Sequence, residues 1–401
     1  MDRLTLPPAA WRNREGLARL CSVLGGREGK ARFVGGAVRD TLLGLDVADI
    51  DIATTHSPER VIALLKGNDI KAVPTGIAHG TVTAVLPGGP VEVTTLRCDI
   101  ATDGRHATVA FTDDWREDAA RRDFTMNALY ADPVTGAIFD YFGGLDDLEA
   151  RRVRFIGDPL QRIAEDHLRI LRFFRFQARF GEEADPAGLD ACATRANDLM
   201  ALSRERIATE LMKLLVAADA VRVVALMIDQ GIFAPVLPEI ESADRLRRLA
   251  EREAQTGIVP DPIRRLAALL PADPAVAEDV AARLKLSKAD RKRLVSAAAP
   301  AGTEPATAIA YRLGIMMAVD RLLLSDRPGD EAVSITGGEP PALPISGGAL
   351  VERGLRKGPD VATALRAIEE QWIAEGFPDG DRVGAIADMI VAQLLRASSK
   401  A

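Results

Sequence analysis

The segment DVADIDIATT, residues 46–55, places two carboxylates one residue apart within a run of apolar and β-branched residues. Side chains alternate along a strand, so we expect Asp49 and Asp51 on one face and Ile50 and Ile52 on the other. At a rise of about 3.3 Å per residue, the two carboxylates begin about 7 Å apart. Like charges at that separation repel, and burial adds a desolvation cost to each. Such a strand predicts a divalent cation with oxygen ligands, although an isolated D-x-D is more often a solvated turn or strand edge.

Size and composition indicate a folded chain with more than one domain. At 401 residues the chain exceeds the length over which a single core keeps growing, and 47% hydrophobic with 27% charged residues is ordinary for a folded protein. The three cysteines are far apart in the sequence, which fits reduced thiols. The sequence contains no cluster of cysteine or histidine residues that would predict a zinc site. Because we find neither a bilayer-spanning apolar run nor a signal-peptide core, we expect a cytoplasmic protein without a membrane partner.

The net charge of −7 is distributed unevenly. Between residues 148 and 180, eight arginines stand against four acidic residues. A local arginine-rich surface can bind phosphates on an otherwise acidic protein, so the overall charge does not exclude a nucleic-acid partner.

Hydrophobic periodicity divides the chain into a mixed α/β part and a helical part. ARFVGG (31–36) predicts a strand that leads into a short helix, and residues 79–97 predict a hairpin around Pro-Gly-Gly-Pro. From about Asp146 the spacing becomes helical, and it predicts continuous helix over 160–180. The stretch 327–348 is rich in proline and glycine and is the best linker candidate.

FVGGAVRD, residues 33–40, combines an apolar strand, two glycines and a helix start. Gly35 and Gly36 let a backbone approach a ligand closely, and a helix start offers free N–H groups to an anion. Arg39 adds positive charge beside them. A phosphate-binding turn and a purely structural turn are both open readings of this motif.

Two further motifs concentrate charge. RRDFTMNA (121–128) contains Asp123, whose role as a helix N-cap would explain one polar residue but not the arginines and Asn127 beside it. EDHLRILRFFRF (165–176) places Asp166 and three arginines at successive steps of three, along one flank of the expected helix. A solvated charged face is the ordinary reading. Arginine at nearly every third position instead suggests bidentate partners such as phosphates or base edges.

Taken together, the motifs between about residues 30 and 240 resemble those of class II CCA-adding enzymes, the tRNA nucleotidyltransferase and bacterial poly(A) polymerase family. The similarity covers more than half of the chain and is close to verbatim in several motifs. Beyond it the chain is only loosely similar, through LPISGGALVERGLRKGP. The matching motifs are GGAVRD, DIDIATT, TGIAHGTVTAV, VEVTTLR, RRDFTMNA, EDHLRILRFFRF and LSRERIATELMKLL.

The resemblance implies an α+β fold with a small mixed-sheet nucleotidyltransferase head followed by an extended all-helical neck, body and tail. The head would span residues 1–145, the neck with a base-selecting helix 146–245, and an RNA-binding body and tail 246–401. The implied activity is template-free addition of C, C and A to the 3′ end of tRNA from CTP and ATP, with release of pyrophosphate.

The resemblance also implies roles for single residues. Asp49 and Asp51 would hold two Mg²⁺ ions, and Glu92 is a candidate third acidic contributor. In the remaining motifs the implied roles are as follows: Gly35, Gly36, Arg39 and Arg122 for the triphosphate; Asp123 and Asn127 for the ribose hydroxyl; Asp166 and Arg169 for the base edge of C or A; Arg172 and Arg175 for the phosphates and the helix; and Glu165 for orienting Arg169.

Several alternatives stay open. A poly(A) polymerase shares every head motif, and enzymes that add only CC or only A are not excluded. A noncatalytic RNA-binding module would have little reason to keep two like charges together. A metal-dependent phosphohydrolase is disfavoured because the four histidines are scattered and form no His-Asp pair.

Overall fold

The computed structural model describes residues 4–102 and 107–398. The chain forms two compact units, of which the first comprises Met1–Ala243 with Ala282–Leu286 and the second Asp244–Ala281 with the chain from Ser287 onward. Within the described ranges, no helix is both long and apolar enough to cross a membrane. The division into head, neck and body at residues 145 and 245 stays a prediction.

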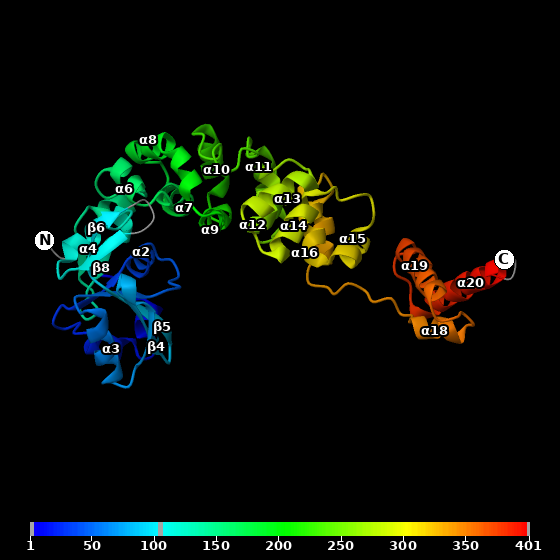
Figure 1. The fold of residues 1–401 in the computed structure, drawn as a ribbon, viewed down its shortest axis with the longest axis horizontal. Coiled ribbons are helices and arrows are strands. Elements are labelled where there is room, and N and C mark those ends of the chain that lie inside the picture. Colours follow the sequence, from blue (N-terminus) through cyan, green and yellow to red (C-terminus); the bar gives the residue numbers. More distant parts are fainter. Residues whose placement is uncertain (1–3, 103–106, 399–401) are drawn as a thin grey trace. The chain divides into compact units, whose positions relative to one another are not determined.

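The first unit is built on a seven-stranded sheet with the order β3-β4-β5-β2-β1-β8-β9, drawn in blue and cyan in Figure 1. The pairing of β2 with β5 is parallel, whereas the other neighbours in this sheet are antiparallel. Strands β6 and β7 form a separate ribbon. The strands are β1 Ala31–Val34, β2 Asp51–Thr54, β3 Lys71–Gly76, β4 Thr81–Leu86, β5 Gly89–Thr95, β6 Arg97–Thr102, β7 Ala107–Phe111, β8 Leu129–Ala131 and β9 Ile138–Asp140.

Helices occupy the rest of the first unit, and from residue 144 onward it contains no described strand. The α-helices are α1 Leu17–Val23, α2 Gly36–Leu42, α3 Pro58–Lys66, α4 Trp115–Ala120, α5 Gly144–Glu149, α6 Pro159–Glu165, α7 Arg169–Phe180, α8 Pro186–Thr194, α9 Arg204–Leu215 and α10 Ala220–Asp229. The 3₁₀ helices are η1 Ala10–Asn13, η2 Ile77–His79, η3 Thr125–Asn127 and η4 Ala196–Ala201. A mixed-sheet part followed by helices is the α+β class expected from the sequence, and that prediction is confirmed.

The described residues of the second unit form helices joined by loops, with no strand, and are drawn from yellow-green to red in Figure 1. Its last helices bury Trp372, whose ring contacts Tyr311 and Phe377 edge-on at centroid distances of 5.4 and 4.8 Å. The helices are α11 Asp244–Thr256, α12 Pro262–Leu269, α13 Pro274–Arg283, α14 Lys288–Ala298, α15 Ala306–Leu313, α16 Ile315–Leu324, α17 Gly329–Ile335, α18 Gly347–Glu352, α19 Pro359–Ala374 and α20 Gly380–Ser398.

One local prediction is wrong and another holds only in part. The stretch 160–180 is not one helix, because α6 ends at Glu165 and Asp166 adopts an extended conformation before α7 begins. The Asp166 carboxylate accepts a hydrogen bond from the Leu168 N–H at 3.1 Å, a local bond that competes with helix formation. The predicted linker 327–348 is irregular over 336–346, but its first part forms the helix α17. That helix starts after Pro328 and carries acidic residues in its first turn, both favourable there.

A cluster of phenylalanine rings joins the sheet part to α7. Phe155 and Phe173 stack with their rings 9° apart and centroids at 5.5 Å, and Phe124 packs against Phe155 and Phe176 at about 5 Å. Aromatic pairs of this kind contribute about 0.5–1.5 kcal/mol each beyond the area that they bury. Phe124 lies within RRDFTMNA, so this cluster places that motif directly against the arginine-bearing helix.

Candidate active site

The two strand carboxylates predicted from the sequence are Asp49 and Asp51, and the structure places only Asp51 in a strand. β2 begins at Asp51, so the expectation that Asp49 is also a strand residue is wrong. Ile50 and Ile52 are buried as expected. The parallel pairing of β2 with β5 sets Asp51 directly opposite Glu92, and the Glu92 N–H donates to the Ile50 carbonyl oxygen at 3.2 Å. Residues 41 positions apart in the chain thus bring two carboxylates together.

The environment of Asp51 disfavours its charge. Burial, followed by the negative charges of Glu92 and Asp49, raises the pKa of Asp51 to about 6, although Arg122 acts in the opposite direction. The described residues contain no group of three or more histidine, cysteine or acidic side chains arranged to hold a metal ion. Mg²⁺ is usually bound by one or two protein carboxylates that are completed by substrate phosphates and water. The oxygen donors at Asp51, Glu92 and Asp49 fit that kind of ion.

Two consecutive glycines, Gly35 and Gly36, lie at the turn between β1 and α2 beside these carboxylates. Gly35 has φ +69° before α2, and a left-handed backbone of this kind favours glycine. An added Cβ there would lie 3.5 Å from Arg122 Nη1, and one at Gly36 would lie 3.7 Å from Arg39 Nη2. The backbone at this turn is therefore bordered by two guanidinium groups.

Arg39 is buried rather than presented to solvent, with 5% of its surface exposed. Its Nε donates to Asp40 Oδ1 at 2.7 Å, its Nη1 donates to Asn127 Oδ1, and its guanidinium lies 4.3 Å from the centre of the Phe180 ring. These contacts tie α2 to η3 and to the end of α7. Arg39 thus stabilises the packing of these elements around the candidate site.

Asp123 joins the sheet part to α7. Its Oδ2 accepts from Arg172 Nε at 2.8 Å, and its Oδ1 accepts from Asn127 Nδ2 and from the Phe124 N–H at 2.9 Å each. Burial opposes ionisation, but the charge of Arg172 and these hydrogen bonds together lower the pKa of Asp123 to about 2. The N-cap prediction is wrong, because the residue that precedes η3 is Phe124.

Arg122 is held by two residues that the sequence reasoning did not single out. Its Nη2 lies 3.3 Å from Asp118 Oδ2, and its Nε donates to the Tyr130 hydroxyl at 3.3 Å. Tyr130 in turn donates to Asp118 Oδ2 at 2.6 Å. Burial opposes the Asp118 charge, yet Arg122, Arg121 and the Tyr130 hydrogen bond lower its pKa to about 2. The signal for this network was the spacing of an acid on a short helix three and four residues before two arginines at and just after the helix end.

The two predicted base-edge residues lie at the junction of α6 and α7. Arg169 Nη1 donates to Glu165 Oε2 at 2.6 Å and its Nη2 to the Arg121 carbonyl oxygen at 3.0 Å. Asp166 receives Arg206 Nη2 at 2.9 and 3.0 Å on its two oxygens. The contact of Glu165 with Arg169 was expected, whereas Arg206 was missed although it lies within a quoted motif, because no local spacing relates it to Asp166.

The arginines between residues 148 and 180 are less available to phosphates than their number suggested. Arg175, for example, donates from Nε to Glu210 Oε2 at 2.5 Å and so ties α7 to α9. Each of the eight forms an ion pair with an acidic side chain of the same unit. The pairs are Arg151–Glu182, Arg152–Asp147, Arg154–Asp147, Arg162–Glu165, Arg169–Glu165, Arg172–Asp123, Arg175–Glu210 and Arg179–Asp40.

Comparison with known proteins places this arrangement in a family. The family model "Poly A polymerase head domain" matches residues 31–154, and the model "Probable RNA and SrmB- binding site of polymerase A" matches residues 185–244. CCA tRNA nucleotidyltransferase 1, mitochondrial, of Homo sapiens is 34% identical over 396 residues, which cover 90% of this chain and 87% of the relative. The chain belongs to the CCA tRNA nucleotidyltransferase family.

A bacterial relative and a solved structure agree with this membership. The CCA-adding enzyme of Limosilactobacillus fermentum is 31% identical over 363 residues, which cover 86% of this chain and 89% of the relative. The crystal structure of the Bacillus stearothermophilus CCA-adding enzyme in complex with CTP superimposes with a TM-score of 0.74 at 27% identity, covering 96% of this chain and 98% of that one. The similarity to this family thus extends over both units of the nucleotidyltransferase.

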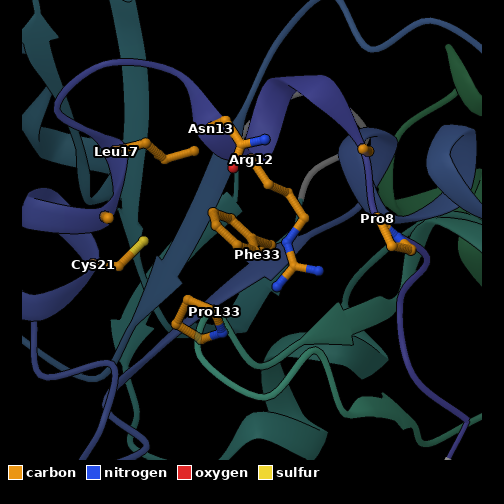
Figure 2. A pocket seen from close by; sticks show the side chains of 9 residues that line it. Pro8, Arg12, Asn13, Leu17, Cys21, Phe33 and Pro133 are labelled. Atoms are coloured by element: carbon orange, nitrogen blue, oxygen red, sulfur yellow. The ribbon is translucent and has the colours of Figure 1, made fainter.

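A separate cavity of about 240 Å³ in the nucleotidyltransferase contains none of the predicted site residues. Figure 2 shows the Arg12 guanidinium and the Cys21 thiol on either side of the Phe33 ring. Burial raises the pKa of Cys21 to about 12, so its thiol is protonated and unsuited to nucleophilic chemistry. The cavity therefore does not compete with the carboxylates of β2 and β5 as a catalytic site. Its lining consists of Pro8, Ala9, Arg12, Asn13, Leu17, Ala18, Cys21, Phe33 and Pro133.

Proposed function

We propose that this nucleotidyltransferase adds C, C and A to the 3′ end of tRNA from CTP and ATP, without a nucleic-acid template and with release of pyrophosphate. The observation that carries the proposal is the register of β2 and β5, which places Asp51 beside Glu92 next to a glycine turn bordered by Arg39 and Arg122. The names of the relatives and the CTP complex of the B. stearothermophilus enzyme support these substrates.

Asp49 and Asp51 would hold Mg²⁺, with Glu92 as a third acidic contributor. When bound, two such ions would supply positive charge at the α-phosphate and favour ionisation of the RNA 3′-hydroxyl. Phosphoryl-type transfer depends on positioning and charge neutralisation more than on a protein nucleophile. The backbone at Gly35 and Gly36 and the guanidinium of Arg122 would receive the triphosphate, while Arg39 would stabilise that turn.

Asp166 and Arg169 would replace a template strand. The exocyclic amino groups of C and A are both donors, and the ring nitrogen next to each is an acceptor on the Watson–Crick edge. A carboxylate that accepts from the amino group and a guanidinium that donates to the ring nitrogen can therefore suit either base. Glu165 orients Arg169, and Asp123 with Asn127 would recognise the ribose hydroxyl.

Arg172 and Arg175 act in this proposal mainly by holding elements together, with a secondary part in binding phosphates. Arg172 fixes Asp123 against α7, and Arg175 fixes α7 against α9. Both side chains already have protein carboxylates as partners, so their direct share in phosphate binding is the smaller one.

Poly(A) addition is the second candidate, because one matching family model is described as a poly A polymerase head domain and the other as a binding site of polymerase A. The human relative, by contrast, is a CCA tRNA nucleotidyltransferase, and its similarity covers 90% of the length of this chain. That similarity extends through the helical second unit and favours tRNA as the acceptor. The cytoplasmic location stays a prediction, since the same human relative is named as mitochondrial.

One assay tests the proposal. Purified full-length protein with Mg²⁺ is given tRNA transcripts that end before C, before the second C, before A or after CCA, each with CTP, ATP or both. Growth by the missing nucleotides alone is the expected result, and long A tails on any transcript would establish poly(A) addition instead. Asp49→Ala is expected to abolish incorporation and to leave the dissociation constant for tRNA within twofold, and full incorporation by that variant would refute the metal-binding role.

A further inference from the structure

A pocket of about 540 Å³ lies within the first unit, where the loop after α2 meets the C-terminal ends of α7 and α9. This volume falls within the range of about 300–1,000 Å³ that is typical of small-ligand sites. Of the residues that line it, Arg175 alone has a role proposed above, chiefly as a tie between α7 and α9. Its lining consists of Leu45, Asp46, Arg175, Arg179, Lys213, Val216, Ala217 and Ala218.

Three of the lining side chains are basic, and two of them keep donors available. Lys213 is exposed and has no ion-pair partner among the residues that the structure describes. Arg179 leaves 46% of its side chain exposed, and its partner Asp40 is shared with Arg39. Available donors on Lys213 and Arg179 suit an anionic group such as a phosphate.

Apolar side chains border the same space. Leu45 and Val216 are 43% and 42% exposed, and both line the pocket. Basic side chains beside exposed apolar ones suit single-stranded nucleic acid, since its phosphates are charged and its base faces are apolar.

The pocket is close to the candidate catalytic carboxylates along the chain. Asp46 lines it, and Asp49 follows three residues later, so their Cα atoms are no more than about 11 Å apart. At a rise of about 3.4 Å per nucleotide, that distance corresponds to about three stacked nucleotides. A strand whose 3′-hydroxyl reaches Asp49 and Asp51 can therefore place an upstream nucleotide in the pocket.

We propose that this pocket binds the single-stranded 3′ end of the acceptor RNA, with Lys213 and Arg179 on a phosphate and Leu45 and Val216 against a base. The proposal rests on the nucleotidyl transfer proposed above, because it requires an RNA 3′ end at the carboxylates. The pocket would keep the growing end in place while the incoming nucleotide changes.

The test uses Lys213→Glu in the full-length protein, with Lys66→Glu as its matched control. Both lysines are exposed and lie in the last turn of a helix, so both reversals have the same cost at the helix terminus, but Lys66 lies on α3 outside the pocket. Lys213→Glu is expected to raise the KM for a tRNA transcript lacking CCA about tenfold, the effect of losing one charge-assisted hydrogen bond. The KM for CTP should change by less than twofold.

Salt dependence separates the phosphate contact from the apolar one. For Lys213→Glu, the slope of log K for tRNA against log salt concentration should become shallower by about 0.7, whereas Leu45→Ala should weaken tRNA binding without changing that slope. Lys213→Ala, which should show the same trends in smaller measure, replaces the reversal if Lys213→Glu does not fold.

Two results would overturn the pocket assignment. A raised KM for CTP with unchanged tRNA binding would place the triphosphate in the pocket, and tRNA binding equal to that of Lys66→Glu would leave the pocket without a role in RNA binding. If the wild-type protein adds no nucleotide to any transcript, the proposed function fails, while the binding measurements with tRNA still decide the pocket assignment.

Discussion

The ion pair between Asp123 and Arg172 connects the sheet part of the first unit to α7, and its removal should be costly. Asp123 is 8% exposed, and its pKa of about 2 lies well below the ordinary value near 3.8. A difference of that size corresponds to about 2–3 kcal/mol in favour of the folded, ionised state. The direction at the partner agrees, because the charge of Asp123 raises the pKa of Arg172. We therefore expect Asp123→Asn to lower the free energy of unfolding by about 2–3 kcal/mol at pH 7.

The pH dependence follows from the same pKa. Because the folded-state pKa of Asp123 is lowered, its contribution is fully present above about pH 4 and is lost as the pH falls toward 2. The difference between wild type and Asp123→Asn should thus stay constant between pH 5 and 8 and shrink below pH 4. Urea unfolding followed by tryptophan fluorescence measures it, since Trp11 and Trp115 lie in the first unit.

A double-mutant cycle with Arg172→Gln isolates the pair itself. We expect a coupling energy of about 1–3 kcal/mol, because each single variant leaves a buried or half-buried partner uncompensated. Asp219→Asn is the control: Asp219 pairs with Arg222 three residues away and both side chains are more than 40% exposed, so a loss below 0.5 kcal/mol is expected. A coupling energy near zero for Asp123 and Arg172, or equal losses in both Asp→Asn variants, would refute the argument.

Two further predictions concern nucleotide choice and the metal-binding carboxylate. Arg206→Ala should raise the KM for CTP about tenfold and reduce discrimination against UTP in single-nucleotide incorporation, because Asp166 loses the donor that orients it. Arg222→Ala is the surface control. Unchanged selectivity in Arg206→Ala would show that Asp166 needs no such support. Asp51→Asn in EDTA at pH 8 should raise the melting temperature, because the charged Asp51 with its pKa of about 6 destabilises the folded state above pH 6 but not below pH 4. Mg²⁺ should raise the melting temperature of the wild type only. A lower melting temperature of Asp51→Asn than of the wild type in EDTA would contradict this.

Local patterns predicted the elements that carry the site. Alternation in ARFV and in the flanks of Pro-Gly-Gly-Pro predicted β1 and the β4–β5 hairpin, and the structure confirms them. Periodicity failed where a side chain interrupted the backbone pattern. The Asp166 carboxylate bonds to the Leu168 N–H and ends α6 within what reads as a continuous amphipathic helix, and apolar spacing alone does not reveal such a bond.

The sequence by itself determined which residues are candidates for the chemistry, because motif and residue type report what a side chain can do: carboxylates in DIDIATT, glycines before a helix, and arginines every third residue. Only the tertiary structure decided which of them meet. The parallel pairing of β2 with β5 brings Glu92 to Asp51, and the packing of α7 gives the arginines acidic partners from distant elements. Charge state and availability for a ligand depend on burial and on neighbours in space, and neither quantity is local in the chain.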